Sequence, residues 1–150
     1  MFTEPLGNWR EAHVLLRRTA VDWATQVKWL VDEAYPDADK IVLVMDNLNT
    51  HTTASLYKAF IPEEAYRISQ KLEIHYTPKH GSWLDIAEIE LSALTVQCLL
   101  DVRIPTIDDL SRILSTWSQN RNSAQKGVDW HFTTNVARAK LVHLYLDIKF

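Results

Sequence analysis

The spacing of apolar and polar positions along the chain predicts four strands. Five consecutive apolar residues, Ile41–Met45, predict a strand buried on both faces, of the kind found inside a parallel or mixed sheet. Leu72–Tyr76 alternates between apolar and polar residues and predicts another strand. Near the start, Met1–Thr3 and His13–Leu16 predict two strands, and the turn signal Gly7-Asn8 between them predicts that they pair as a hairpin.

Apolar residues that recur three and four positions apart predict helices between and after these strands. Thr19 is expected to cap the first helix. The predicted helices cover residues 20–34, 53–60, 62–70, 82–100, a stretch from 107 onward, and 133–144. This order of elements predicts one α/β domain over residues 1–150, with additional helices towards its C-terminal end.

Composition places the chain among ordinary globular proteins. Of its 150 residues, 47% are hydrophobic and 23% are charged, which is enough apolar material for one domain with one core. The single cysteine, Cys98, has no partner for an internal disulfide and is expected to be a buried, reduced thiol. No apolar run is long enough to cross a bilayer, and the start lacks the pattern of a signal peptide. We therefore expect a cytoplasmic location.

The net charge limits the ways in which the chain would bind nucleic acid. It is −3 at pH 7, with a pI of about 6.0. A protein that coats DNA by releasing counterions needs a strongly basic face, so the charge argues against that class. It leaves open an enzyme that binds phosphates locally through a metal ion and a few cationic side chains.

The first candidate for chemistry is Asp46, which directly follows the apolar run 41–45. Ligands of α/β proteins bind where strands leave the sheet, so a carboxylate at this point is well placed for binding. Asn47, Asn49 and His51 follow closely and are expected to support Asp46. The same residues are also typical of a turn or a helix cap, and a lone histidine is more often structural than a ligand. Both interpretations stay open on this pattern alone.

A second polar cluster follows the strand predicted at 72–76. Lys79 and His80 are cationic, or become so on protonation, and suit a phosphate that approaches a metal ion. Ser82 and Asp85 have the spacing of a capping box at the start of the next helix, with Asp in place of the usual Glu. Asp85 is therefore expected to be mainly structural.

Glu88 lies one turn further into that helix. It falls on the side of the apolar residues Leu84 and Leu91, where a carboxylate is costly to bury unless it is paired or binds a metal. Glu90 is expected to point into solvent. The sequence therefore predicts Asp46 and Glu88 as metal ligands.

The stretches 41–51 and 75–91 resemble the catalytic core of bacterial insertion-sequence transposases in the mariner-like DDE superfamily. Those proteins show an Asp-Asn-x-x-x-His strand end and, further along, a Leu-Asn-x-x-Glu helix start. The first motif is met by Asp46, Asn47 and His51, and the second by Leu84, Asp85 and Glu88, with Asp85 in place of the usual Asn. Two motifs in this order make the resemblance specific.

The resemblance implies a ribonuclease-H-like mixed sheet flanked by helices. It also implies that Asp46 and Glu88 are the second and third acids of a metal-binding triad that holds two Mg²⁺ or Mn²⁺ ions. The implied activity is cleavage of DNA at transposon ends, followed by attack of the freed 3′ hydroxyl on target DNA. Transposon ends and target DNA are then the partners.

The first acid of such a triad belongs on an earlier strand. Glu4 and Asp22 are the nearest acids, and neither is predicted at the centre of a strand. We therefore expect an amino-terminally truncated transposase domain that lacks its first strand and has impaired activity. One alternative is a non-catalytic fragment that self-associates, or that binds and modulates a full-length transposase through an exposed sheet edge. Another is an unrelated zinc phosphohydrolase that uses Asp46, His51, His75 and His80.

The first prediction concerns the 150-residue chain on its own. With two of three acidic ligands, it should bind Mg²⁺ weakly and should not cut DNA detectably, which isothermal calorimetry and a plasmid-nicking assay would measure. Robust cleavage that disappears on Asp46→Ala would contradict this expectation.

Overall fold

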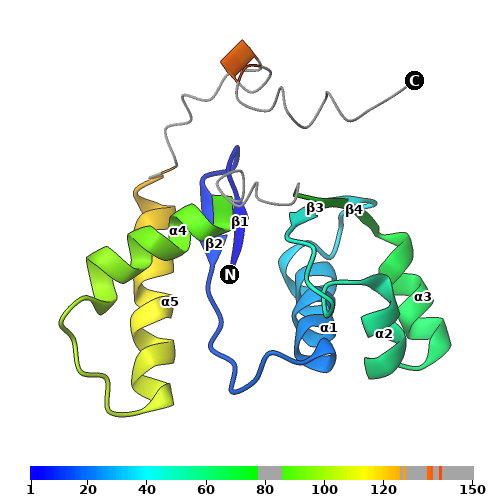
Figure 1. Ribbon diagram of the computed structural model, residues 1–150, viewed down its shortest axis with the longest axis horizontal. Coiled ribbons are helices and arrows are strands. Elements are labelled where there is room, and N and C mark those ends of the chain that lie inside the picture. The colour runs from blue at the N-terminus through cyan, green and yellow to red at the C-terminus, as the bar shows by residue number, and fades with distance from the viewer. Residues whose placement is uncertain (78–85, 126, 128–134, 137–138, 140–150) are drawn as a thin grey trace.

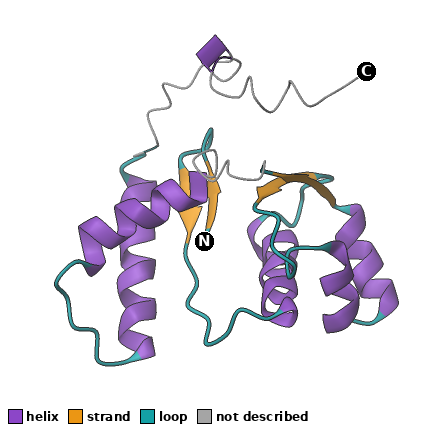
Figure 2. Ribbon diagram, in the orientation of Figure 1, coloured by secondary structure: helices purple, strands orange, loops and turns teal. Residues whose placement is uncertain are grey.

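The computed structural model describes residues 1–77, 86–125, 127, 135–136 and 139, and it confirms an α/β fold (Figures 1 and 2). The strands are β1 (Phe2–Glu4), β2 (Trp9–Glu11), β3 (Ile41–Met45) and β4 (Leu72–Tyr76). The helices are α1 (Ala20–Trp29), α2 (Thr53–Ala59), α3 (Pro62–Gln70), α4 (Ile86–Leu94) and α5 (Ile107–Ser123). Helix α1 continues as a π-helical turn, Leu30–Ala34, and α4 as another, Thr95–Leu99. Within the described residues, no helix is long and apolar enough to cross a membrane.

Most of the predicted elements are present. Thr19 caps α1 as expected, and its side chain and that of Asp22 form a reciprocal capping box. The start of the helix predicted at 82–100 lies outside the described residues, as does most of the one predicted at 133–144. The described strands form two separate pairs, antiparallel β1–β2 and parallel β3–β4.

The prediction of the second strand was wrong. The hairpin turns at residues 5–8, where Asn8 adopts a φ of 53°, and Glu4 pairs directly with Trp9. A turn this short requires the second strand to begin at once, so β2 covers 9–11 and not 13–16. The stretch predicted as a strand is instead an irregular connection, in which Leu16 is 86% exposed.

Strands β3 and β4 pack one face against α1, α2 and α3 (Figure 1). The buried residues of this first core are Ala24, Val27, Val31, Leu56, Ala65, Ile68 and Leu72. On the other face, Val42 and Val44 are 61% and 58% exposed. The prediction that Ile41–Met45 is buried on both faces was therefore wrong, because the described helices cover one face of this two-stranded sheet.

A second core lies between α4 and α5, which cross the hairpin on its other side (Figure 1). Its buried residues are Ala12, Leu94, Leu114 and Trp117. Leu110 of α5 packs against them. Leu91 of α4 is 44% exposed, whereas Leu94 is buried.

The β1–β2 hairpin joins the two cores because alternate residues of a strand point to opposite faces. On one face, Phe2 and Trp9 stack against Trp29 with ring centroids 6.0 and 6.5 Å apart. On the same face, the Tyr35 hydroxyl donates to Glu4 over 2.7 Å. Arg10 lies on the opposite face, towards α4 and α5.

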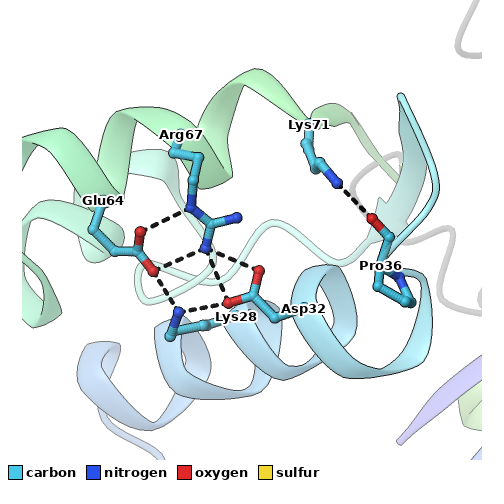
Figure 3. A network of polar contacts seen from close by, with 6 residues as sticks. All are labelled: Lys28, Asp32, Pro36, Glu64, Arg67 and Lys71. Atoms are coloured by element: carbon cyan, nitrogen blue, oxygen red, sulfur yellow. Dashed lines mark hydrogen bonds and ion pairs between the residues drawn. The ribbon is translucent and has the colours of Figure 1, made fainter.

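Four charged side chains tie α1 to α3 (Figure 3). Arg67 donates from Nε and Nη2 to the two carboxylate oxygens of Glu64, over 2.8 Å each, and from Nη2 to Asp32 over 2.9 Å. Lys28 contacts both acids from α1. Hydrogen bonds from Arg67 and then Lys28 lower the pKa of Glu64 to about 2. Each acid thus faces two cations in an alternating network.

This network should make stability depend on pH. The folded-state pKa of Glu64 lies below its unfolded value of about 4.3, so its contribution is present at neutral pH and is lost as the pH falls from about 5 towards 2. Glu64→Gln should lower the free energy of unfolding at pH 7 by about 1 kcal/mol and flatten its dependence on pH in that range. Urea titrations at several pH values would measure both effects. The exposed neighbour is the control: Glu63→Gln should leave the slope unchanged.

Candidate functional site

Asp46 stands directly after the last residue of β3, as the sequence predicted. Its Oδ1 lies 2.5 Å from Nδ1 of His51, and the two side chains are 39% and 25% exposed. The sequence therefore brings an acid and a histidine five positions apart into contact at the end of the strand. The pair is accessible to a ligand from solvent and is partly covered by protein.

The loop between these two residues is held by hydrogen bonds to neighbouring elements. The backbone N–H of His51 donates to the carbonyl of Leu48 over 2.9 Å, and the Tyr76 hydroxyl of β4 donates to the carbonyl of His51 over 2.8 Å. Ser55 of α2 donates to the carbonyl of Thr50 over 2.7 Å. A carboxylate on a loop fixed at several points is well suited to binding with defined geometry.

Trp23 of α1 completes the support of this pair. Its ring stacks on the His51 imidazole with centroids 5.9 Å apart and an angle of 26° between the planes. Trp23 is not among the site residues predicted from the sequence. Nothing in the local pattern distinguishes it from the other tryptophans, because its partner lies 28 positions further along the chain and on another element.

The Asp46–His51 pair has the chemistry of part of a metal site. The close approach of His51 Nδ1 to Asp46 Oδ1 leaves the other carboxylate oxygen, Oδ2, for a cation. Among the described residues, no side chain donates a hydrogen bond to Asp46 Oδ2. Carboxylate oxygens suit hard ions such as Mg²⁺ and Mn²⁺. No group of three or more His, Cys, Asp or Glu in the described ranges is arranged to hold a metal, so the pair fits such a site and needs further ligands.

The structure reverses the expected burial of the two acids on α4. Glu88 is exposed, whereas Glu90 is 1% exposed. The prediction that Glu90 points into solvent was wrong because Arg10 and Arg121, both distant in sequence, form ion pairs with it inside the protein. Because Glu88 is exposed, its carboxylate does not pay the desolvation cost that was expected from its position near apolar residues.

The remaining predicted site residues divide into three groups. Lys79, His80 and Asp85 lie outside the described residues. Asn47 and Asn49 are exposed in the loop beside Asp46. His75 lies on the exposed face of β4, where Nε2 is 2.8 Å from Oε1 of Glu73. The structure does not bring His75 to Asp46 and His51, so the proposed zinc set loses that member.

The two other acids considered for a metal triad have structural partners. Glu4 ends β1 and accepts the hydrogen bond of Tyr35, and Asp22 forms the capping box of α1. Two hydrogen bonds from Thr19, one from its side chain and one from its backbone, lower the pKa of Asp22. Both positions agree with the expectation that neither acid occupies the centre of a strand beside Asp46.

Comparison with known proteins gives one match. A family model described as DDE superfamily endonuclease matches residues 2–111, a span that includes both Asp46 and Glu88. Comparisons with curated proteins and with solved structures gave no match.

The stacking of Trp23 on His51 is expected to hold the imidazole ring in place. Trp23→Ala should release the imidazole, so that the ring signals of His51 in NMR spectra shift and broaden, and should lower the free energy of unfolding by about 2 kcal/mol. Trp23→Phe keeps an aromatic face and should preserve the His51 signals. Unchanged His51 signals in a folded Trp23→Ala protein would show that the stack does not hold the ring.

Proposed function

The chain belongs to the DDE superfamily endonucleases, and from this premise we propose that residues 1–150 form the catalytic domain of a DNA transposase. The proposed reaction is metal-dependent cleavage of DNA strands followed by strand transfer. The α/β architecture, with helices packed on a parallel strand pair, is consistent with a ribonuclease-H-like domain of this family. The observation that carries the proposal is the Asp46–His51 pair at the end of β3.

In this proposal, Asp46 is a metal ligand and His51 orients it. The imidazole lies against Oδ1 and Trp23 stacks on the imidazole, so Oδ2 would be the oxygen that holds the metal. Such a relay fixes the carboxylate before the metal arrives, which lowers the entropy lost on binding. Asn47 and Asn49 are exposed in the same loop, where amide groups are able to contact the metal's water shell or the DNA backbone.

Glu88 is the second proposed ligand, supplied by the first turn of α4. Its exposure in a protein that buries Glu90 two positions away supports a role that needs access to solvent. When bound, two Mg²⁺ or Mn²⁺ ions would activate the attacking oxygen and stabilise the leaving oxygen of the phosphodiester. Lys79, His80 and Asp85 are proposed to support this site from the segment between β4 and α4.

Metal titrations test this proposal directly. Asp46→Asn and Glu88→Gln each remove a charge with little change in shape, and each should weaken Mn²⁺ binding by about tenfold or more. Free Mn²⁺ measured by electron paramagnetic resonance gives the affinity without requiring DNA cleavage. The matched control is Glu73→Gln, an exposed acid on β4 that pairs with His75, which should bind Mn²⁺ like the parent.

The two variants distinguish the contributions of the two acids. If Asp46→Asn and the parent bind Mn²⁺ equally, the proposed site at the end of β3 is wrong. If only Glu88→Gln has no effect, Asp46 binds metal without this residue, and another acid must be sought.

A further inference from the structure

A buried ion triad joins three parts of the chain that are far apart in sequence. Arg10 of β2 and Glu90 of α4 are each 1% exposed, and Arg10 Nε lies 3.1 Å from Glu90 Oε2. Arg121 of α5, 14% exposed, places Nη2 3.3 Å from Glu90 Oε1. Glu90 Oε1 accepts hydrogen bonds from Nη2 of Arg10 and from Nη2 of Arg121, over 3.3 Å each, so the two guanidinium groups meet at one carboxylate.

The partners of Glu90 are themselves held in place. The side-chain amide of Asn122 accepts a hydrogen bond from the Arg10 backbone N–H over 3.0 Å and donates one to the Arg10 carbonyl over 2.9 Å. Arg121 lies over the Trp117 ring at 5.1 Å and donates to Gln97 over 3.3 Å. Two guanidinium groups with fixed positions therefore define where the Glu90 carboxylate must lie.

Helix geometry converts the burial of Glu90 into a direction for Glu88. Successive residues of an α-helix are rotated by 100°, so positions 88 and 90 project about 200° apart around the axis. Both residues belong to the regular α-helical part of α4. A helix whose Glu90 side is locked inwards must present Glu88 outwards.

A buried ion triad is an energetically costly way to hold α4 in place. Burial, and then the positive charge of Arg121, lower the pKa of Arg10 against the opposing effect of Glu90. Buried ion triads are often replaceable by apolar side chains of similar volume without loss of stability. What apolar side chains lack is the directional geometry of a carboxylate between two guanidinium groups. The triad therefore specifies orientation more than it adds stability.

We propose that Glu90 is a positioning residue whose triad with Arg10 and Arg121 sets the rotation of α4 and so aims Glu88 at the metal and DNA. This inference rests on the proposed function, because the orientation of Glu88 matters for activity only if Glu88 binds the metal. It adds the hairpin and α5 to the parts of the chain on which the site depends.

The orientation of α4 is measurable without metal or DNA. Nitroxide labels at Thr25→Cys on α1 and Glu88→Cys on α4, in a Cys98→Ser background, give a distance distribution by pulsed electron resonance. The intact triad should give one narrow peak. Glu90→Gln, which keeps the shape and removes the charge, should broaden or shift it.

A second variant separates orientation from folding. Arg10→Met, Glu90→Leu and Arg121→Met together replace the triad by apolar side chains, and this protein should unfold cooperatively like the parent while its distance peak broadens. The control is Arg112→Ala, which removes an exposed ion pair with Asp109 on α5 and should leave the peak unchanged. An unchanged narrow peak in the folded triple variant would overturn the positioning role.

Mn²⁺ affinity, measured with Glu88 in place, connects orientation to function. Glu90→Gln should weaken Mn²⁺ binding severalfold, in proportion to the broadening of the distance peak, whereas Arg112→Ala should not. If the peak broadens but Glu88→Gln binds Mn²⁺ like the parent, the proposed metal role of Glu88 fails while α4 is still shown to be set by the triad. If the peak broadens, Glu88→Gln binds weakly and Glu90→Gln binds normally, the positioning role itself is overturned.

Discussion

The described structure depends on one buried ion pair, that of Arg10 with Glu90. A charge inside a protein must be matched, and removing one partner of such a pair is strongly destabilising because the other is left unpaired. The pair therefore fixes how the hairpin and α4 meet. Because Arg121 joins from α5, the same constraint extends to the whole second core.

The hairpin transmits this constraint to the rest of the molecule. Its two strands have only three residues each, yet their alternation presents aromatic side chains to α1 and an arginine to α4 and α5. The aromatic contacts of Trp29 bury apolar surface, whereas the hydrogen bonds of the ion triad are directional. One face of the hairpin thus packs its aromatic side chains against the first core. The other face fixes the orientation of the second core through the ion triad.

Features that rest on local pattern were predictable from the sequence. The cap at Thr19, the helices of the first core and the position of Asp46 all follow from residues a few positions apart. The contact of Asp46 with His51 is also local, and the family motif pointed to both residues. The site was predictable to the extent that it is built from one strand end and the loop after it.

Features that rest on distant contacts were not predictable. Glu90 looks like a solvated acid until Arg10 is known to lie beside it, and the two are 80 positions apart. The support of His51 by Trp23 was missed for the same reason. The second strand was misplaced because the apolar content of 13–16 outweighed a turn whose length requires pairing to begin at Trp9.

The bond pattern of Asn122 has a consequence for how the protein behaves at high concentration. The backbone N–H and carbonyl of Arg10 point away from β1, and the side-chain amide of Asn122 forms hydrogen bonds with both of them. A neighbouring strand would form the same two bonds. Unsatisfied backbone groups along an outer strand are templates for aggregation. The Asn122 side chain thus takes the place of one residue of an added strand. It makes this edge of β2 a poor template for pairing with a strand of another molecule.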